Sequence, residues 1–189
     1  MNRRTHAALA LLAILMYGCQ GGDGSRAVDN NSKLAPDDGE ALIREYIARD
    51  GRGERLRASA WFSDRVQWPV EPGWDESTVV ASYSIERVAA DSQSVRCRVV
   101  QRTLGFVSAT DSAFLTFRES PSTDTVIFQA TATSLGWRLV GPRYNPHVSL
   151  AAAIADSSLE NGSRRRLIQL YRQQGADGEA PVAPKACSD

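Results

Sequence analysis

The feature that most constrains the fold of this chain is an alternation of apolar and polar side chains between Thr78 and Val140. Successive side chains of a β-strand point to opposite faces, so a repeat of two residues indicates strands that are buried on one face only. A helix would need apolar residues three or four positions apart. The apolar positions of the first two expected strands are Val79, Ala81, Tyr83 and Ile85, and then Val95, Cys97 and Val99.

The turns between the expected strands are short, and no helix interrupts them. Parallel neighbours would need long crossover connections, so short turns favour an antiparallel meander. The sequence therefore predicts a curved antiparallel sheet of about five strands. The first strand begins at Ser77, and the others are expected around Val95 to Val99, Phe114 to Phe117, Val126 to Thr133 and Trp137 to Val140. The turns between them are expected at Asp91-Ser92, Ser120-Pro121-Ser122 and Ser134-Leu135-Gly136.

Helical patterns flank the strands at both ends. Leu42, Ile43, Tyr46 and Ile47 recur with helical spacing before the stop at Asp50-Gly51. Further helices are expected over Glu54 to Phe62, Pro146 to Asp156 and Ser163 to Gln174. The fold class is therefore α+β, with N-terminal helices packed on the sheet and additional C-terminal helices. We expect one domain over residues 39–175 and a disordered tail over residues 176–189.

The first residues have the pattern of a secretory signal. Arg3 and Arg4 supply a positive start, and Ala7 through Met16 form an apolar run without a charge. As a helix this run and Tyr17 would cover roughly 17 Å, about half of what a membrane span requires. We therefore expect residues 1–18 to be a signal peptide that directs secretion across the inner membrane.

The end of this segment, Leu15-Met16-Tyr17-Gly18-Cys19, resembles the lipobox of bacterial lipoproteins. Met16 stands where leucine is usual, and Tyr17 is bulkier than the common residues. The resemblance implies that Cys19 carries palmitate or similar acyl chains and becomes the new N-terminus. Residues 19–38 would then be a flexible lipidated linker, and the domain a cell-envelope protein anchored on the periplasmic face. Cleavage and release without a lipid is the alternative.

The order of helices and strands, with the late strand Gly136-Trp137-Arg138-Leu139-Val140, is similar to the nuclear transport factor 2-like (NTF2-like, or SnoaL-like) family. That resemblance implies a cone-shaped α+β domain and covers about residues 39–142. The two C-terminal helices depart from the compact family pattern.

Charge and residue inventory exclude several classes of function. The 22 basic and 22 acidic residues cancel, so the electrostatic basis of nucleic-acid binding is missing. One histidine, His147, follows the signal, which argues against a metal site or a catalytic triad, and we read His147 with Ser149 as a helix start. We expect no cofactor, no metal and no catalytic residue, and we expect Cys97 to pack as a small apolar side chain rather than to bond with Cys187.

The candidate ligand site is aromatic. Trp68 and Trp74 belong to a proline-containing loop, where they either form a wall for a small molecule or cap the core. Tyr83, Phe128 and Trp137 are expected on the concave face of the sheet, where they would line a small apolar pocket.

Three functions remain open at this point. The first is a membrane-anchored module that binds a small apolar ligand or serves an envelope protein. The second is an isomerase or dehydratase of the cone-fold type, which needs an acidic side chain facing the pocket, whereas the strand positions assigned there are apolar or tyrosine. The third is a non-catalytic structural or interaction protein of the cell envelope.

Overall fold

The computed structural model describes residues 35–68, 73–111 and 114–176, and all of them belong to one compact unit, Lys33–Asp189. Cys19, the signal peptide and the tail from residue 177 lie outside the described residues, so their roles stay predictions. The elements in chain order are α1 (Pro36–Gly51), η1 (Arg55–Arg57), α2 (Ala60–Arg65), β1 (Glu76–Ala90), β2 (Ser94–Asp111), β3 (Phe114–Thr133), β4 (Gly136–Gly141), β5 (His147–Ser149), α3 (Leu150–Ala155) and α4 (Asn161–Ala176).

The architecture is α+β, as predicted, with a curled five-stranded sheet in the order β4-β3-β2-β1-β5. The four strands β1 to β4 pair antiparallel in sequence order, as expected. The expectation of a wholly antiparallel sheet is wrong, because β5 pairs parallel with β1, with His147 opposite Thr78. The segment from Pro146, predicted as the start of a helix, is extended instead, and the Pro146 carbonyl accepts a hydrogen bond from the Thr78 backbone.

β3 is one continuous strand where two strands and a turn were expected. The predicted turn at Ser120-Pro121-Ser122 is therefore wrong. Thr103 of β2 pairs with Ser122 and Gly105 pairs with Glu119, so Pro121 lies at an irregularity of the ladder. Proline lacks the N–H that a regular ladder requires, and a bulge is one of the few places in a sheet that accepts it.

The long strands bend at Gly105. This residue has φ of +150°, and a Cβ there would lie 2.1 Å from the carbonyl oxygen of Arg118. Only glycine allows the backbones of β2 and β3 to approach so closely. The same place carries the register shift between β2 and β3, so the bulge and the glycine together bend the sheet.

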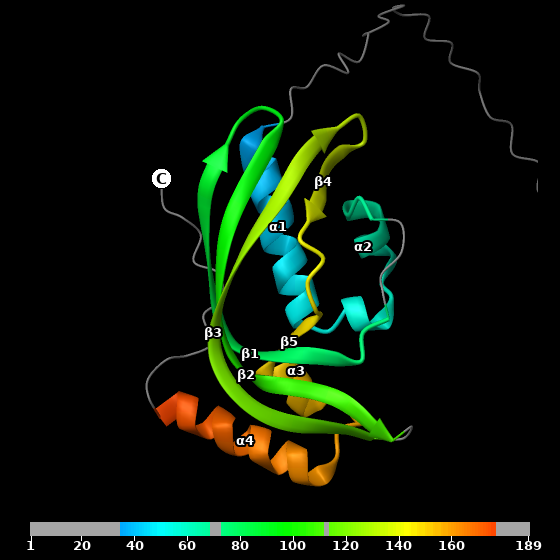
Figure 1. Ribbon diagram of the computed structural model, residues 1–189, viewed down its shortest axis with the longest axis vertical. Coiled ribbons are helices and arrows are strands. Elements are labelled where there is room, and N and C mark those ends of the chain that lie inside the picture. The colour runs from blue at the N-terminus through cyan, green and yellow to red at the C-terminus, as the bar shows by residue number, and fades with distance from the viewer. Residues whose placement is uncertain (1–34, 69–72, 112–113, 177–189) are drawn as a thin grey trace, which may run out of the picture. The chain divides into compact units, whose positions relative to one another are not determined.

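One core, the α1 cluster, lies where α1 occupies the inside of the curve (Figure 1). Pro36 in the first turn and the acidic Asp37 and Asp38 favour the start of α1. Tyr46 packs edge-on against Phe62, with ring centroids 5.3 Å apart. The cluster consists of Leu42, Ile43, Tyr46, Ile47, Phe62, Val66, Trp68, Val95, Cys97, Val99, Val126, Phe128, Ala130, Trp137 and Leu139.

A second core, the α4 cluster, joins the other end of the strands to the C-terminal helices. Figure 1 shows α4 outside the curve of the sheet, opposite to α1. Its members are aliphatic: Val79, Leu104, Val107, Val148, Leu150, Ala153, Leu159, Leu167 and Leu170. The two cores therefore stabilise opposite faces at the two ends of one bent sheet.

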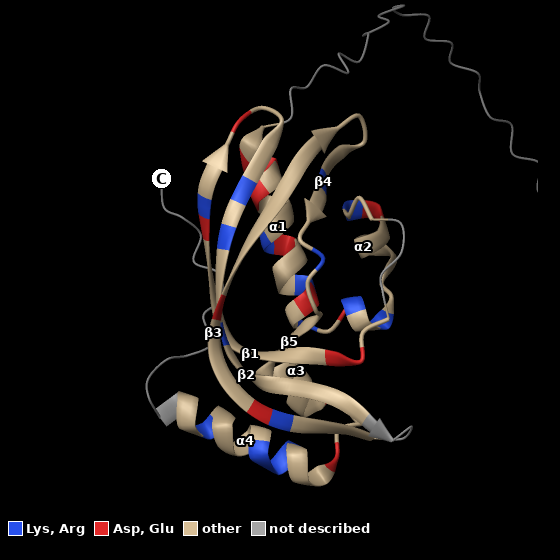
Figure 2. Ribbon diagram, in the orientation of Figure 1, with Lys and Arg blue, Asp and Glu red and all other residues tan. Residues whose placement is uncertain are grey.

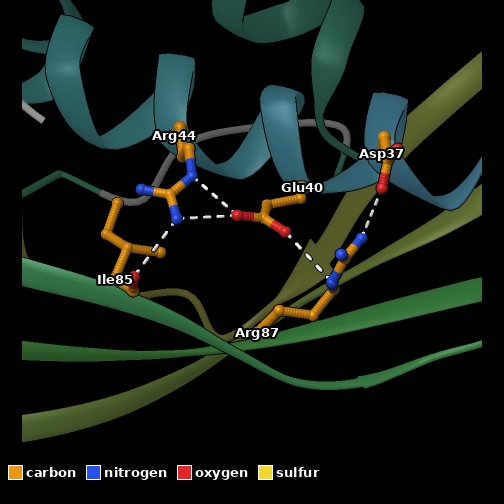
Figure 3. A network of polar contacts seen from close by, with 5 residues as sticks. All are labelled: Asp37, Glu40, Arg44, Ile85 and Arg87. Atoms are coloured by element: carbon orange, nitrogen blue, oxygen red, sulfur yellow. Dashed lines mark hydrogen bonds and ion pairs between the residues drawn. The ribbon is translucent and has the colours of Figure 1, made fainter. Parts of the chain in front are cut away.

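A polar network fastens the N-terminal half of α1 to β1 (Figure 3). Glu40 receives Arg44 from its own helix at 2.6 Å and Arg87 from β1 at 3.2 Å. Arg44 also donates to the carbonyl oxygen of Ile85, and Arg87 pairs with Asp37. Within the described ranges, no helix is both long enough and apolar enough to span a membrane.

Candidate functional site

A cavity of about 170 Å³ opens beside η1, and we call it the η1 pocket. Its walls come from η1 and the residues before it, from strands β1, β2, β3 and β5, and from helix α3 with the residues after it. Its lining residues are Arg52, Gly53, Leu56, Arg57, Ser77, Val107, Leu115, Val148, Ala152, Ala153, Asp156 and Leu159.

The connection between α1 and η1 depends on Gly53. Its φ is +74°, a conformation that other residues rarely adopt, and its N–H donates to the Asp50 carbonyl at 2.7 Å. A Cβ at this position would lie 3.8 Å from Val148 Cγ1. Gly53 thus turns the chain at a point close to β5, and Leu56 and Arg57 of η1 line the same pocket as Val148.

The interior of the η1 pocket is aliphatic. Val107, Val148 and Leu159 belong to the α4 cluster, and the small side chains of Ala152 and Ala153 leave space above them. Small residues at a packed surface leave a gap when the neighbouring side chains cannot move in to fill it. The pocket is therefore suited to an apolar guest.

Polar groups lie among the same lining residues. Arg57 is exposed, and neither its guanidinium nor the hydroxyl of Ser77 has a partner among the described residues. Arg52 donates to Glu54 at 2.8 Å, and Asp156 accepts hydrogen bonds from the backbone and hydroxyl of Ser158. Figure 2 shows that η1 carries basic residues.

Behind the pocket lies a buried ionic cluster of Asp50, Arg55 and His147. Asp50 Oδ2 lies 2.8 Å from His147 Nδ1, a contact that is an ion pair when the imidazole is protonated, and 3.6 Å from the Arg55 guanidinium. It also accepts the His147 backbone N–H at 3.3 Å. Arg55 donates to the Tyr144 carbonyl at 2.8 Å. Because the three residues come from the end of α1, from η1 and from β5, the cluster holds the pocket walls together.

Four atoms of this cluster make no hydrogen bond among the described residues, namely Asp50 Oδ1, Arg55 Nε and both ring nitrogens of His147. The side chains of Asp50 and His147 are each about 1% exposed. A carboxylate beside an imidazole is the kind of pair that acid–base catalysis uses. Here the two side chains are in contact, but neither ring nitrogen makes a hydrogen bond that would fix the orientation of the imidazole.

The structure does not gather the five sequence-predicted aromatic residues around one cavity. Phe128 and Trp137 lie in the α1 cluster, where Trp137 covers Gly39 and also lines a separate open depression of about 310 Å³ beside Leu42. Tyr83 is half-buried against the same cluster. Burial raises the pKa of the Tyr83 phenol. The hollow where a pocket was expected holds Tyr46 and its neighbours, which pack against Phe128 with ring centroids 5.9 Å apart.

The two loop tryptophans also lie apart from the η1 pocket. Trp68 belongs to the α1 cluster and lines a separate depression of about 150 Å³ with Phe62 and Val66. Trp74 is half-buried, with the Arg55 guanidinium 5.5 Å from its ring centroid. This contact is a cation–π interaction.

Sequence reasoning missed both the η1 pocket and the ionic cluster. Asp50 was assigned to a helix stop and His147 to a helix start. The available signal was a solitary histidine among apolar residues, but its acidic partner is 97 positions away in the chain. No local pattern connects residues at that separation.

Metal and thiol chemistry have little support in the described part of the chain. No group of three or more potential ligands among His, Cys, Asp and Glu occurs in the described residues. Cys97 is unpaired and fully buried, as its apolar neighbours predicted, while Cys187 lies outside the described residues. Burial raises the pKa of the Cys97 thiol to about 11, with a smaller contribution from the charge of Glu40.

Comparison with protein-family models, with curated proteins and with solved structures finds no match to this chain.

Proposed function

We propose that this protein is an extracytoplasmic binding module, held at the cell-envelope membrane by acyl chains on Cys19, that takes up a small apolar ligand in the η1 pocket. The observation that carries the proposal is the cavity itself, with an aliphatic interior and a few polar groups. This combination is typical of small-molecule sites. The module would be a cone-shaped domain of the NTF2-like kind, extended by α3 and α4.

The size of the pocket limits the ligand. Sites for drug-sized molecules usually measure about 300 Å³ or more. An apolar cavity of about 150 Å³ holds a guest the size of benzene. The η1 pocket, at about 170 Å³, therefore suits an apolar body of about six carbon atoms.

Filling the cavity tests this proposal. Ala152 lines the pocket on α3, and its neighbour Ala151 is exposed and does not. We expect Ala152→Leu to abolish binding of hexanol in an NMR titration, because the added carbon atoms occupy the same space. Ala151→Leu, the matched control, should leave binding unchanged. Binding that survives Ala152→Leu would place the ligand elsewhere.

Mass spectrometry of the native protein tests the anchor. We expect an N-terminus at Cys19 with the mass of its acyl chains added. The lipid adds about 0.8 kcal/mol of membrane affinity for each buried methylene, so two or three chains hold the domain permanently at the membrane. A product that still begins at Met1 would contradict both secretion and anchoring.

The second candidate, a cone-fold isomerase or dehydratase, is favoured by one specific observation. Sequence reasoning found no acidic side chain facing the interior, whereas Asp50 is buried behind the η1 pocket, 2.8 Å from His147. Catalysis requires that a substrate reach His147 Nε2. Diethylpyrocarbonate, which modifies accessible imidazoles, should therefore react with His147 in the folded protein if this candidate is right. Reaction only after unfolding would contradict it.

A further inference from the structure

We infer that the depression of about 150 Å³ beside Trp68 is a second small-molecule site, and that it takes a neutral guest with a single aromatic ring. We call it the Trp68 depression. Its lining includes Arg55 of η1, Ala58 at the end of η1, Phe62 and Ser63 of α2, and Trp68. No described residue lines both this depression and the η1 pocket, so the inference goes beyond the proposed function and does not depend on it.

Two walls of the Trp68 depression are aromatic and fixed in place. Phe62 is 3% exposed and Trp68 is 7% exposed. Each of these rings packs edge-on against Tyr46 of α1, with centroids 5.3 Å and 6.4 Å apart. Walls that are already ordered lose little entropy when a guest binds. Contacts between aromatic rings also add to the affinity that burial of apolar area supplies.

A buried cation belongs to the same lining. The Arg55 side chain is 2% exposed, and its guanidinium lies 5.9 Å from the ring centroid of Tyr46 and 5.5 Å from that of Trp74. Asp50 and the carbonyl of Tyr144 keep the guanidinium there. A guanidinium withdrawn from water attracts the face of an aromatic ring more strongly than an exposed one does. An aromatic guest therefore gains a contact beside Arg55 that a saturated guest of equal size lacks.

The backbone at the edge of the depression is strained. Ala58 has φ of +51°, and within the described ranges it is the only residue other than glycine with a positive φ. Alanine is less favourable than glycine in this conformation. Strain of this kind is concentrated at ligand sites. Ser59, the next residue, makes no capping hydrogen bond to α2, so its hydroxyl can bond to a polar group on the guest.

The volume limits the guest to one ring. An apolar cavity of about 150 Å³ holds a molecule the size of benzene. The Trp68 depression has this volume, and two fused rings would extend into water. Phenol combines one ring with one hydroxyl, so it is the probe that matches the lining.

The experiment compares phenol with cyclohexanol on the full chain with Cys19→Ser, which keeps every described residue. The two probes have the same number of carbon atoms and one hydroxyl each, so they differ chiefly in the aromaticity of the ring. NMR titration follows the indole N–H signals, and the signal of Trp68 is identified by its loss in Trp68→Phe. We expect millimolar affinity for phenol and about fivefold weaker binding of cyclohexanol, the middle of the range that one aromatic contact adds.

Three variants test the location and the role of the rings. Ser63→Leu fills the depression from an exposed position and should weaken phenol binding at least tenfold. Asp64→Leu is the matched control, because Asp64 is the exposed neighbour on α2 and does not line the depression. Phe62→Leu removes one ring and should lower phenol affinity to that of cyclohexanol, with cyclohexanol unchanged. If circular dichroism shows that Phe62→Leu is unfolded, the two probes and Ser63→Leu still decide the question.

Two results would overturn the inference. The first is equal affinity for phenol and cyclohexanol, even if Ser63→Leu weakens both. The second is phenol binding that survives Ser63→Leu or that leaves the Trp68 signal unshifted, because the ring would then lie elsewhere.

Ala152→Leu distinguishes this inference from the proposed function. It should leave phenol binding unchanged, since Ala152 lines only the η1 pocket. If Ala152→Leu abolishes phenol binding, phenol occupies the η1 pocket and the second site is overturned, whereas the proposed function stands. If phenol binds at the Trp68 depression and hexanol binds nowhere, the second site stands and the proposed function fails.

Discussion

The two ends of the bent sheet are packed by different kinds of side chain. The α1 cluster contains aromatic rings in mutual contact, with Tyr46 touching Phe62, Trp68 and Phe128. The α4 cluster is built from valine, leucine and alanine in its buried members. Large flat rings fill the inside of the curve, whereas the small side chains of α3 leave the η1 pocket open. The depression beside Trp68 shows that the aromatic end also has hollows, but these lie at its surface rather than between Tyr46 and Phe128.

Between these ends lie the features that belong to neither core. Gly105 bends the strands, and the cluster of Asp50, Arg55 and His147 joins α1 and η1 to β5. If the two ends are separate packing units, changes at the junction should affect the whole domain, and changes inside one core should act mainly on that core.

The largest loss of stability is expected when the buried Asp50 is replaced. Asp50→Ala leaves Arg55 and His147 without their carboxylate in a site that water does not reach, and we expect a loss of about 4 kcal/mol in the free energy of unfolding. Urea denaturation measures it. Asp64→Ala is the control, because Asp64 is exposed and has no partner among the described residues. Equal stability of the two variants would show that the cluster contributes nothing.

The next largest losses of stability are expected when one buried side chain is truncated in each cluster, which compares the two ends of the sheet directly. Leu167 and Phe128 are both 0% exposed, one in each cluster. We expect Leu167→Ala and Phe128→Ala each to lower the free energy of unfolding by about 3 kcal/mol. Hydrogen exchange should then rise chiefly in α4 for the first and chiefly in α1 for the second. Equal acceleration in both helices would contradict separate packing units.

The bend should be sensitive to a single methyl group. Gly105→Ala places a Cβ against the Arg118 carbonyl, and we expect a loss of about 2 kcal/mol from strain and displaced backbone. Gly51→Ala is the matched control, since a Cβ there meets nothing within 4 Å. The comparison is made by thermal unfolding. A neutral Gly105→Ala would mean that β2 and β3 can separate without penalty.

The rate at which a thiol reagent modifies Cys97 measures how often the α1 cluster opens. With a pKa of about 11, only about one thiol in a thousand is ionised near pH 8, and burial hinders access further. The raised pKa favours the folded state below pH 9, and that contribution is lost as the pH rises toward 11. In a Cys187→Ser chain we expect Cys97 to react with a thiol reagent only when the α1 cluster opens. Rapid reaction near pH 8 would disprove its burial.

The smallest loss of stability is expected when the partly exposed network of Figure 3 is changed at Arg87. Arg87→Met keeps the apolar stem and removes the pairs with Asp37 and Glu40. We expect a loss of at most about 1 kcal/mol, which should vanish in about 1 M salt because exposed ion pairs are screened. A larger loss that persists in high salt would mean that the network does more than fasten α1 to β1.

Local patterns predicted much of the fold. The repeat of two residues indicated five antiparallel strands over the stretch that forms the four strands β1 to β4, and the spacing of Leu42, Tyr46 and their neighbours indicated α1. Two errors concern prolines. Pro121 was assigned to a turn because proline interrupts a regular ladder, and Pro146 to a helix because proline is favoured in a first turn, whereas here an irregular ladder and a sheet edge accommodate them.

The candidate site was less predictable than the fold. Aromatic residues were expected to form the pocket, but close packing placed Phe128 and Trp137 in the core. The residues that do line a cavity, among them Ala152, Ser77 and Arg57, are individually unremarkable in sequence and become a site only because three distant segments meet.

Taken alone, the order of amino acids determined the class of fold, most of the strands and the first helix, because these depend on residues within a few positions of one another. The faces of β1 were not determined in this way: Val79 packs in the α4 cluster and Tyr83 against the α1 cluster, on either side of an irregularity in the ladder. The partnership of Asp50 with His147, the parallel strand β5 and the position of the pocket were decided by the tertiary structure. Contacts between segments nearly a hundred residues apart depend on how the bent sheet brings them together, and no repeat along the chain encodes that geometry.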